Sequence, residues 1–169
     1  MLNENKVNIT INNKQLTPVA QPHTYKEALL LKADTGASGH YVASKDKHKI
    51  GIKNLRRTTT PKVVLLPNQE TIQSTYDSEL VIPIVSHQSK SATIFPNLTN
   101  ASLLSIGKLC DDDCTAIFTK EDMKMMKEKE IVLEGKHNKE DGLWDVQLND
   151  TPAPEQLNAI IQKNKQKQN

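Results

Sequence analysis

A single carboxylate on a short turn is the clearest chemical feature of this 169-residue chain. Asp34 opens an Asp-Thr-Gly triplet within the stretch ADTGAS, residues 33–38, and an apolar run at residues 28–31 leads into it. Asp-X-Gly is also an ordinary turn signal, and the tripeptide alone favours a plain turn. The apolar run before it favours a buried strand that delivers the carboxylate to the floor of a cleft.

The four residues after the carboxylate suit such a site. Gly36 lets the backbone pass close to a neighbour, and the Thr35 hydroxyl can lock the turn by bonding to nearby backbone. Ala37 and Ser38 are small, so the space above the carboxylate stays open. We therefore predict Asp34 as a catalytic residue supported by Thr35–Ser38.

One carboxylate is only half of an acid protease site. Acid proteolysis uses two carboxylates, one ionised and one protonated, which share a proton over a water molecule. The sequence contains no second Asp-Thr-Gly triplet. If the chain is a protease, the second carboxylate must come from a second copy, so we expect a homodimer.

Short strand patterns dominate the rest of the chain and predict a compact all-β barrel or sandwich. The expected strands are residues 7–11, 27–33, 62–66, 71–75, 79–84 and 91–95, followed by a meander at 114–118, 123–126, 131–133 and 143–148. Turns are expected at 67–70 and 76–78. One short helix is expected at 103–109, capped by Asn100 or Ser102, and a weak terminal helix at 155–165.

Composition and charge narrow the function classes. The chain has 36% hydrophobic and 4% aromatic residues, which is few for a monomeric core of this size. This composition fits a fold completed by dimerisation or a piece excised from a polyprotein. The formal net charge is only +2, so nucleic-acid binding is not expected. No run is apolar enough for a membrane span and Met1 begins no signal-peptide pattern, which predicts a cytoplasmic protein without a membrane partner.

Other candidate sites are weaker. The basic stretch at residues 45–60 lacks interleaved aromatic residues and is expected to be a solvated loop and edge strand. Cys110 and Cys114 are separated by three residues, and no His pair follows at zinc-finger spacing. Buried small side chains are therefore favoured over a metal site with His40 or His137. Trp144 is expected to anchor the core. We predict no metal and no cofactor.

Three blocks, taken in order, give the chain a resemblance to a known family. They are ADTGASGHYV at 33–42, ATIFPNLTNASLLSIGKL at 92–109, and the stretch from CTAIFTKEDM at 114–123 to GLWDVQL at 142–148. The chain resembles the retropepsin-like aspartic protease of copia-type long-terminal-repeat retrotransposon polyproteins. The first block is similar to that family's active-site block, with its His two places after Ala-Ser.

The resemblance implies an all-β, retropepsin-like closed barrel that cleaves polyprotein peptide bonds as a homodimer with one catalytic Asp34 per chain. It implies that Thr35 bonds across the dimer axis and that the Gly36 carbonyl helps hold substrate. Ser38 replaces an acidic residue of many retroviral proteases. The glycine-rich flap of those enzymes has no equivalent between Pro61 and Pro83, so a stiffer flap tip is expected at 67–69 or 76–78.

The same resemblance suggests a division of the chain. Residues 1–26 form an N-terminal strand and loop, and 27–112 the protease core. Residues 113–150 form a β-meander extension toward integrase, and 151–169 a helical, frayed tail. Two other functions remain open at this point: a non-catalytic dimeric scaffold left from a retroelement, and an RNA-binding linker favoured only by the basic stretch.

Overall fold

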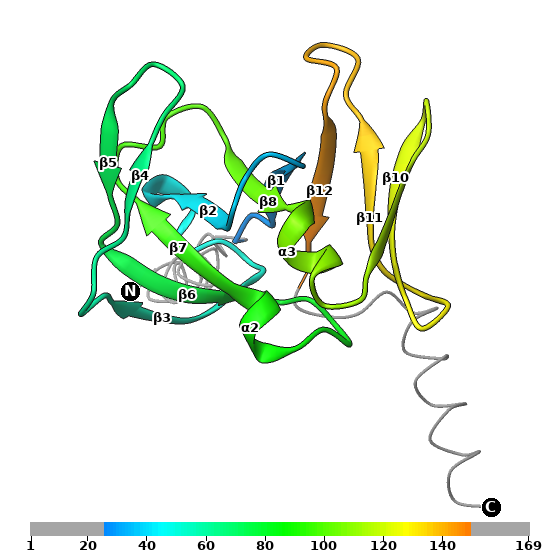
Figure 1. Ribbon diagram of the computed structural model, residues 1–169, viewed down its shortest axis with the longest axis horizontal. Helices are drawn as coiled ribbons and strands as arrows, with labels where there is room; N and C mark the ends of the chain where they lie inside the picture. Colours follow the sequence, from blue (N-terminus) through cyan, green and yellow to red (C-terminus); the bar gives the residue numbers. More distant parts are fainter. Residues whose placement is uncertain (1–25, 150–169) are drawn as a thin grey trace, which may run out of the picture.

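The computed structural model describes residues 26–149 (Figure 1). Its strands are β1 (Leu29–Asp34), β2 (His40–Ala43), β3 (Ile52–Arg57), β4 (Val63–Leu65), β5 (Thr71–Gln73), β6 (Tyr76–Leu80), β7 (Ser91–Phe95), β8 (Ser102–Ser105), β9 (Thr115–Phe118), β10 (Asp122–Lys127), β11 (Glu130–His137) and β12 (Trp144–Leu148). Short helices are η2 (Ser44–Asp46), α2 (His87–Lys90) and α3 (Ile106–Cys110). The all-β prediction is confirmed.

Ten of these strands form one sheet in the order β3-β6-β7-β2-β8-β1-β12-β11-β10-β9, and β4 pairs only with β5. The expected closed barrel is not found, because the order of the described strands ends at β3 on one side and at β9 on the other. In Figure 1 the meander strands β10–β12 stand on the right, β3, β6 and β7 lie on the left, and α3 is drawn between them.

The strand that carries Asp34 lies inside this sheet. β1 pairs in parallel with β8 and antiparallel with β12, so the predicted meander continues the sheet directly from the strand of the candidate site. Leu29 and Leu31 are fully buried while Leu30 is 47% exposed, which is the alternation of a strand with one core face. The apolar residues buried on this face and on its neighbours form one continuous core.

Lys32 is the unexpected residue of this strand. Its ammonium group forms ion pairs with Asp141 and Asp145, the second of which lies on β12. Burial opposes the charge of Lys32, but the two carboxylates outweigh it and raise the Lys32 pKa. The pairs connect the Asp34 strand to the meander by charge as well as by backbone hydrogen bonds.

The expected helix at 103–109 is half wrong. Ser102–Ser105 is strand β8, and only Ile106–Cys110 is helical. The apolar pair at 103 and 104 completes the sheet between β1 and β2, so pairing overrides the helical spacing. The helix begins at Ser105, whose hydroxyl accepts from the Lys108 N–H, and not at Asn100 or Ser102.

Other elements show a mixed outcome. The turn predicted at 76–78 is wrong, because these residues begin β6, and the strand predicted at 79–84 ends at Leu80. The turn at 67–70 is confirmed, and Gln69 in it has a φ of 68°, in the left-handed region that non-glycine residues seldom adopt. Helix α2 was not expected. The strand at 7–11, the terminal helix at 155–165 and the outer segments 1–26 and 151–169 lie outside the described residues, apart from residue 26.

The four meander strands are confirmed, each within a few residues of its expected bounds. Antiparallel pairs join β9 to β10, β10 to β11 and β11 to β12. The boundary at residue 112 stays a prediction. Across residues 26–149, no helix is both long enough and apolar enough to cross a membrane.

Candidate active site

The Asp34 carboxylate is held by the backbone of its own turn. Its Oδ1 accepts hydrogen bonds from the N–H of Gly36 at 2.7 Å and of Ala37 at 3.1 Å. A Cβ at position 36 would lie 3.3 Å from that oxygen, so glycine gives the backbone its close approach. Within residues 26–149, both of these hydrogen bonds go to Oδ1 and no group donates to Oδ2.

The residues predicted to support Asp34 do lie around it. Thr35 and Ser38 are exposed, Asp34 and Ala37 are half-buried, and the whole turn is at the surface. The Ser38 hydroxyl is 2.7 Å from that of Tyr41 on β2. The Thr35 side chain has no hydrogen-bond partner within residues 26–149, so its hydroxyl stays available.

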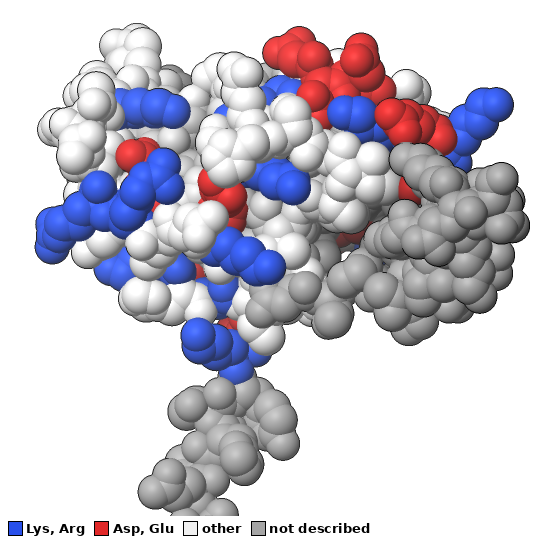
Figure 2. Space-filling model, turned by 90° about the horizontal axis from the view of Figure 1, so that it is seen from below, with Lys and Arg blue, Asp and Glu red and all other residues white. Residues whose placement is uncertain are grey.

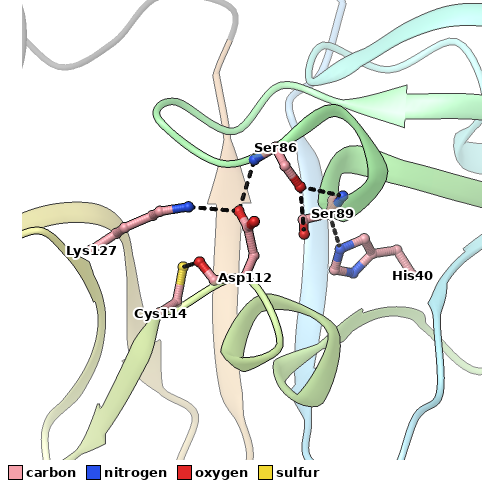
Figure 3. Close-up of polar contacts among 6 residues, drawn as sticks. All are labelled: His40, Ser86, Ser89, Asp112, Cys114 and Lys127. Carbon is pink, nitrogen blue, oxygen red and sulfur yellow. Dashed lines mark hydrogen bonds and ion pairs between the residues drawn. The ribbon is translucent and has the colours of Figure 1, made fainter.

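His40 is a buried residue that supports the Asp34 turn through Ser105, a role that the sequence analysis missed. The imidazole is 1% exposed and uses both ring nitrogens. Nδ1 accepts from the backbone N–H of Ser105 at 2.9 Å. Nε2 donates to the Ser89 carbonyl at 2.8 Å (Figure 3). The Ser105 hydroxyl in turn donates to the Ala37 carbonyl at 2.6 Å. The signal in the sequence was the His of the block ADTGASGHYV.

This environment keeps His40 neutral. Burial lowers the pKa of His40 to about 4, and the nearby positive charge of Lys108 acts in the same direction, while the Ser89 carbonyl opposes it. The neutral ring with its proton on Nε2 satisfies both partners. The tautomer is therefore fixed by hydrogen bonding to two different elements, α2 and the start of α3.

A second buried bond locks the far end of β2. The Ser102 hydroxyl donates to Asp46 at 2.7 Å and accepts from the Ala43 N–H at 2.9 Å. Asp46 is 5% exposed and forms an ion pair with Lys49 at 3.0 Å. These contacts join β2 and η2 to β8, the strand that pairs with the Asp34 strand.

The acidic run at residues 111–113 forms no hydrogen bond or ion pair with Asp34. Asp112 lies between Ser86 and Lys127, accepting from the Ser86 N–H at 2.7 Å and from the Lys127 ammonium at 2.8 Å (Figure 3). These two bonds lower the pKa of Asp112 to about 2. The carboxylate thus ties α2, the end of α3 and β10 together.

The β4–β5 hairpin stands apart from the large sheet. It pairs with no strand of the large sheet, and its turn at 66–70 closes through a Leu66 N–H to Glu70 carbonyl bond of 2.8 Å. Val63 and Leu65 are 65% and 66% exposed, while Ile72 is 4% exposed. The hairpin therefore has a buried side, with Ile72, and an apolar side that faces solvent, with Val63 and Leu65.

The basic stretch at residues 45–60 was predicted to be a solvated loop and an edge strand, and it contains an edge strand. Strand β3 is an edge strand, and Lys53 and Arg56 lie opposite Glu79 and Asp77 on β6. The Arg57 guanidinium lies over the Tyr76 ring, as does Lys47. Figure 2 shows carboxylates among the basic side chains of this face.

No metal site emerges from residues 26–149, where no group of three His, Cys, Asp or Glu side chains could hold an ion. Cys114 is buried and Cys110 exposed, and both are free thiols. The Trp144 ring packs against Phe118 and His137 at the edge of the core, and its Nε1 donates to the Thr119 carbonyl.

Comparisons of the chain with protein-family models, with curated proteins and with solved structures found no match in any of the three. The family resemblance therefore stays a prediction from the sequence blocks.

Proposed function

We propose that the chain is one subunit of an aspartic endopeptidase that cleaves retrotransposon polyprotein peptide bonds as a homodimer. Each subunit contributes one Asp34, and the two carboxylates share one proton. The ionised carboxylate takes a proton from the attacking water, and the protonated one polarises the scissile carbonyl. The reaction uses no metal or cofactor.

The fixed orientation of one carboxylate carries this proposal. Asp34 Oδ1 accepts two backbone N–H groups, and Oδ2 has no donor among the described residues. A carboxylate held on one oxygen and open on the other suits a group that handles water. The free Thr35 hydroxyl beside it suits a bond to a second subunit, and the exposed apolar side of the β4–β5 hairpin suits a cover for a bound peptide.

A non-catalytic dimeric scaffold is the second candidate function. It would keep the sheet and the dimer but has no use for an oriented carboxylate. The buried bonds that hold the Asp34 turn favour the enzyme over this candidate.

The test is digestion of the matching polyprotein, and of a mixed peptide library, by wild type and by Asp34→Asn side by side. The variant keeps the shape of the side chain but supplies no base, so cleavage should fall by roughly 10²–10⁴-fold or vanish while fold and dimer persist. Asp113→Asn is the matched control, because Asp113 is exposed at a φ of 61°, which Asn also adopts, and should keep full activity.

The pH profile and a chelator complete the test. The singly protonated pair is the active form, so the rate should follow a bell with its optimum between mildly acidic and near-neutral pH. Activity should survive EDTA. Full activity in the Asp34→Asn variant, or collapse with EDTA, would overturn the proposal.

A further inference from the structure

His40 reaches the candidate catalytic carboxylate through a short series of hydrogen bonds. Its Nδ1 accepts from the Ser105 N–H, and the Ser105 hydroxyl donates to the Ala37 carbonyl. The N–H of the same Ala37 donates to Asp34 Oδ1 at 3.1 Å. The ring lies outside the turn, yet it fixes the residue that holds the carboxylate from one side.

We propose that neutral His40 is a positioning residue for the Asp34 carboxylate, acting through Ser105, and that protonation of His40 releases the turn. A proton on Nδ1 would face the N–H of Ser105, so two donors would meet and the bond would be lost. Nε2 would keep its bond to Ser89. The catalytic consequence rests on the proposed function, but the coupling between ring and turn does not.

The charges around His40 act against its protonation. Lys108 on α3 is the charged group whose field reaches the ring, and its ammonium is held against the β7 backbone. Strands β7 and β8 carry no ionisable side chain. On α2, His87 pairs with Glu79 and Lys90 lines a separate cavity between β6 and β11. Burial lowers the pKa of the ring in the same direction.

The coupling can be measured without any substrate. In the Asp34→Asn variant, Asp34 no longer titrates, so pH-dependent NMR shifts of the Gly36 and Ala37 amides report on the turn alone. We expect both amides to shift together with the His40 ring resonances as the pH falls below 5. In the double variant His40→Asn with Asp34→Asn, these shifts should disappear.

Two substitutions at position 40 separate positioning from packing. The amide of Asn overlies the Nδ1 edge of His and accepts from Ser105, whereas the amide of Gln overlies the Nε2 edge and donates to Ser89. For the peptide cleaved fastest in the library, we expect His40→Gln to lower kcat at least tenfold with KM changed less than threefold. His40→Asn should restore kcat to within about threefold and shift the acid limb to lower pH.

Each outcome decides the proposal. Gly36 and Ala37 amides that ignore the His40 titration would overturn it, whatever the protein cleaves. Equal kcat losses in the Gln and Asn variants would reduce His40 to a packing residue. If wild type cleaves no substrate while the amides follow His40, the proposed function fails and the positioning role stands.

Discussion

The Asp34 turn and the β4–β5 hairpin are both surface segments of the same molecule, but they are held in opposite ways. Asp34 is bonded to its own turn, and the turn is bonded through Ser105 to a histidine that is 1% exposed. Each link in this series is a hydrogen bond between two named groups. The hairpin instead pairs with itself, and its Val63 and Leu65 side chains are about two-thirds exposed.

If the chain has the proposed function, this contrast matches two requirements of a peptide-cleaving site. A group that handles protons must stay within a fraction of an ångström of its working position, and buried hydrogen bonds to neighbouring elements achieve this. A segment that admits and covers a chain has to open, and few tertiary contacts make opening cheap.

Acid should weaken the turn region first. Burial lowers the pKa of His40 to about 4 in the folded protein, compared with 6.5 for an ordinary histidine. Between pH 6.5 and pH 4 the unfolded chain therefore binds a proton at His40 and the folded chain does not. The stability contributed by neutral His40 is thus complete above pH 6.5 and is lost as the pH falls toward 4, by about 3 kcal/mol.

Urea unfolding at pH 7 and pH 4.5 measures this loss, and His40→Asn is the control, because it lacks the titrating ring. The variant should be less stable than wild type at pH 7 but should lose less on acidification. An equal loss in both proteins would contradict the assignment to His40.

Removing the Ser105 hydroxyl should have the next largest effect. Ser105→Ala deletes the cap of α3 and leaves the Ala37 carbonyl without its donor, at a cost of about 1–3 kcal/mol in the free energy of unfolding. Ser86→Ala is the matched control, because Ser86 caps the short helix α2 from an exposed position and should cost less than about 1 kcal/mol. If urea unfolding gives equal costs for the two variants, the bond from Ser105 to the Ala37 carbonyl adds nothing to the free energy of unfolding beyond the helix cap.

The dimer should depend on Thr35 more weakly. One chain supplies one Asp34, so activity should rise steeply with protein concentration and fall below the dimer dissociation constant. Thr35→Ala should weaken association by roughly 0.5–1.5 kcal/mol for each lost bond, measured by sedimentation. Thr35→Ser keeps the hydroxyl and is the control. An obligate monomer that cleaves at full rate would contradict the dimeric site.

The sequence predicted the strand and the exposed turn that carry Asp34, but it did not predict the buried hydrogen bonds that support them. The apolar run before Asp34 and the small residues after it are local signals, and both the strand and the open turn follow from them. The roles of His40, Ser102 and Ser105 depend on strands that are far apart in the chain, so no local pattern reports them.

The same reasoning explains the errors. Residues 103 and 104 have helical spacing, but the gap between β1 and β2 draws them into the sheet. Polar residues at 76–78 suggested a turn, whereas pairing with β7 makes them a strand. Sheet closure is a property of all strands at once, and the spacing of strands in the sequence does not determine it.

The smallest effect on stability should come from the exposed side of the hairpin. Val63→Thr with Leu65→Thr removes apolar groups that are about two-thirds exposed, so the free energy of unfolding should change by less than about 0.5 kcal/mol. If these side chains cover a bound peptide, each contributes binding energy only in the complex. KM should then rise several-fold while kcat stays near the wild-type value, because contacts made equally in the ground and transition states affect binding alone. Ile72→Val, on the buried side, is the control and should cost about 0.5–1.5 kcal/mol of stability with KM unchanged. A double variant that lowers stability as much as Ile72→Val would show that the two exposed residues are part of the core, and the contrast between the two regions would fail.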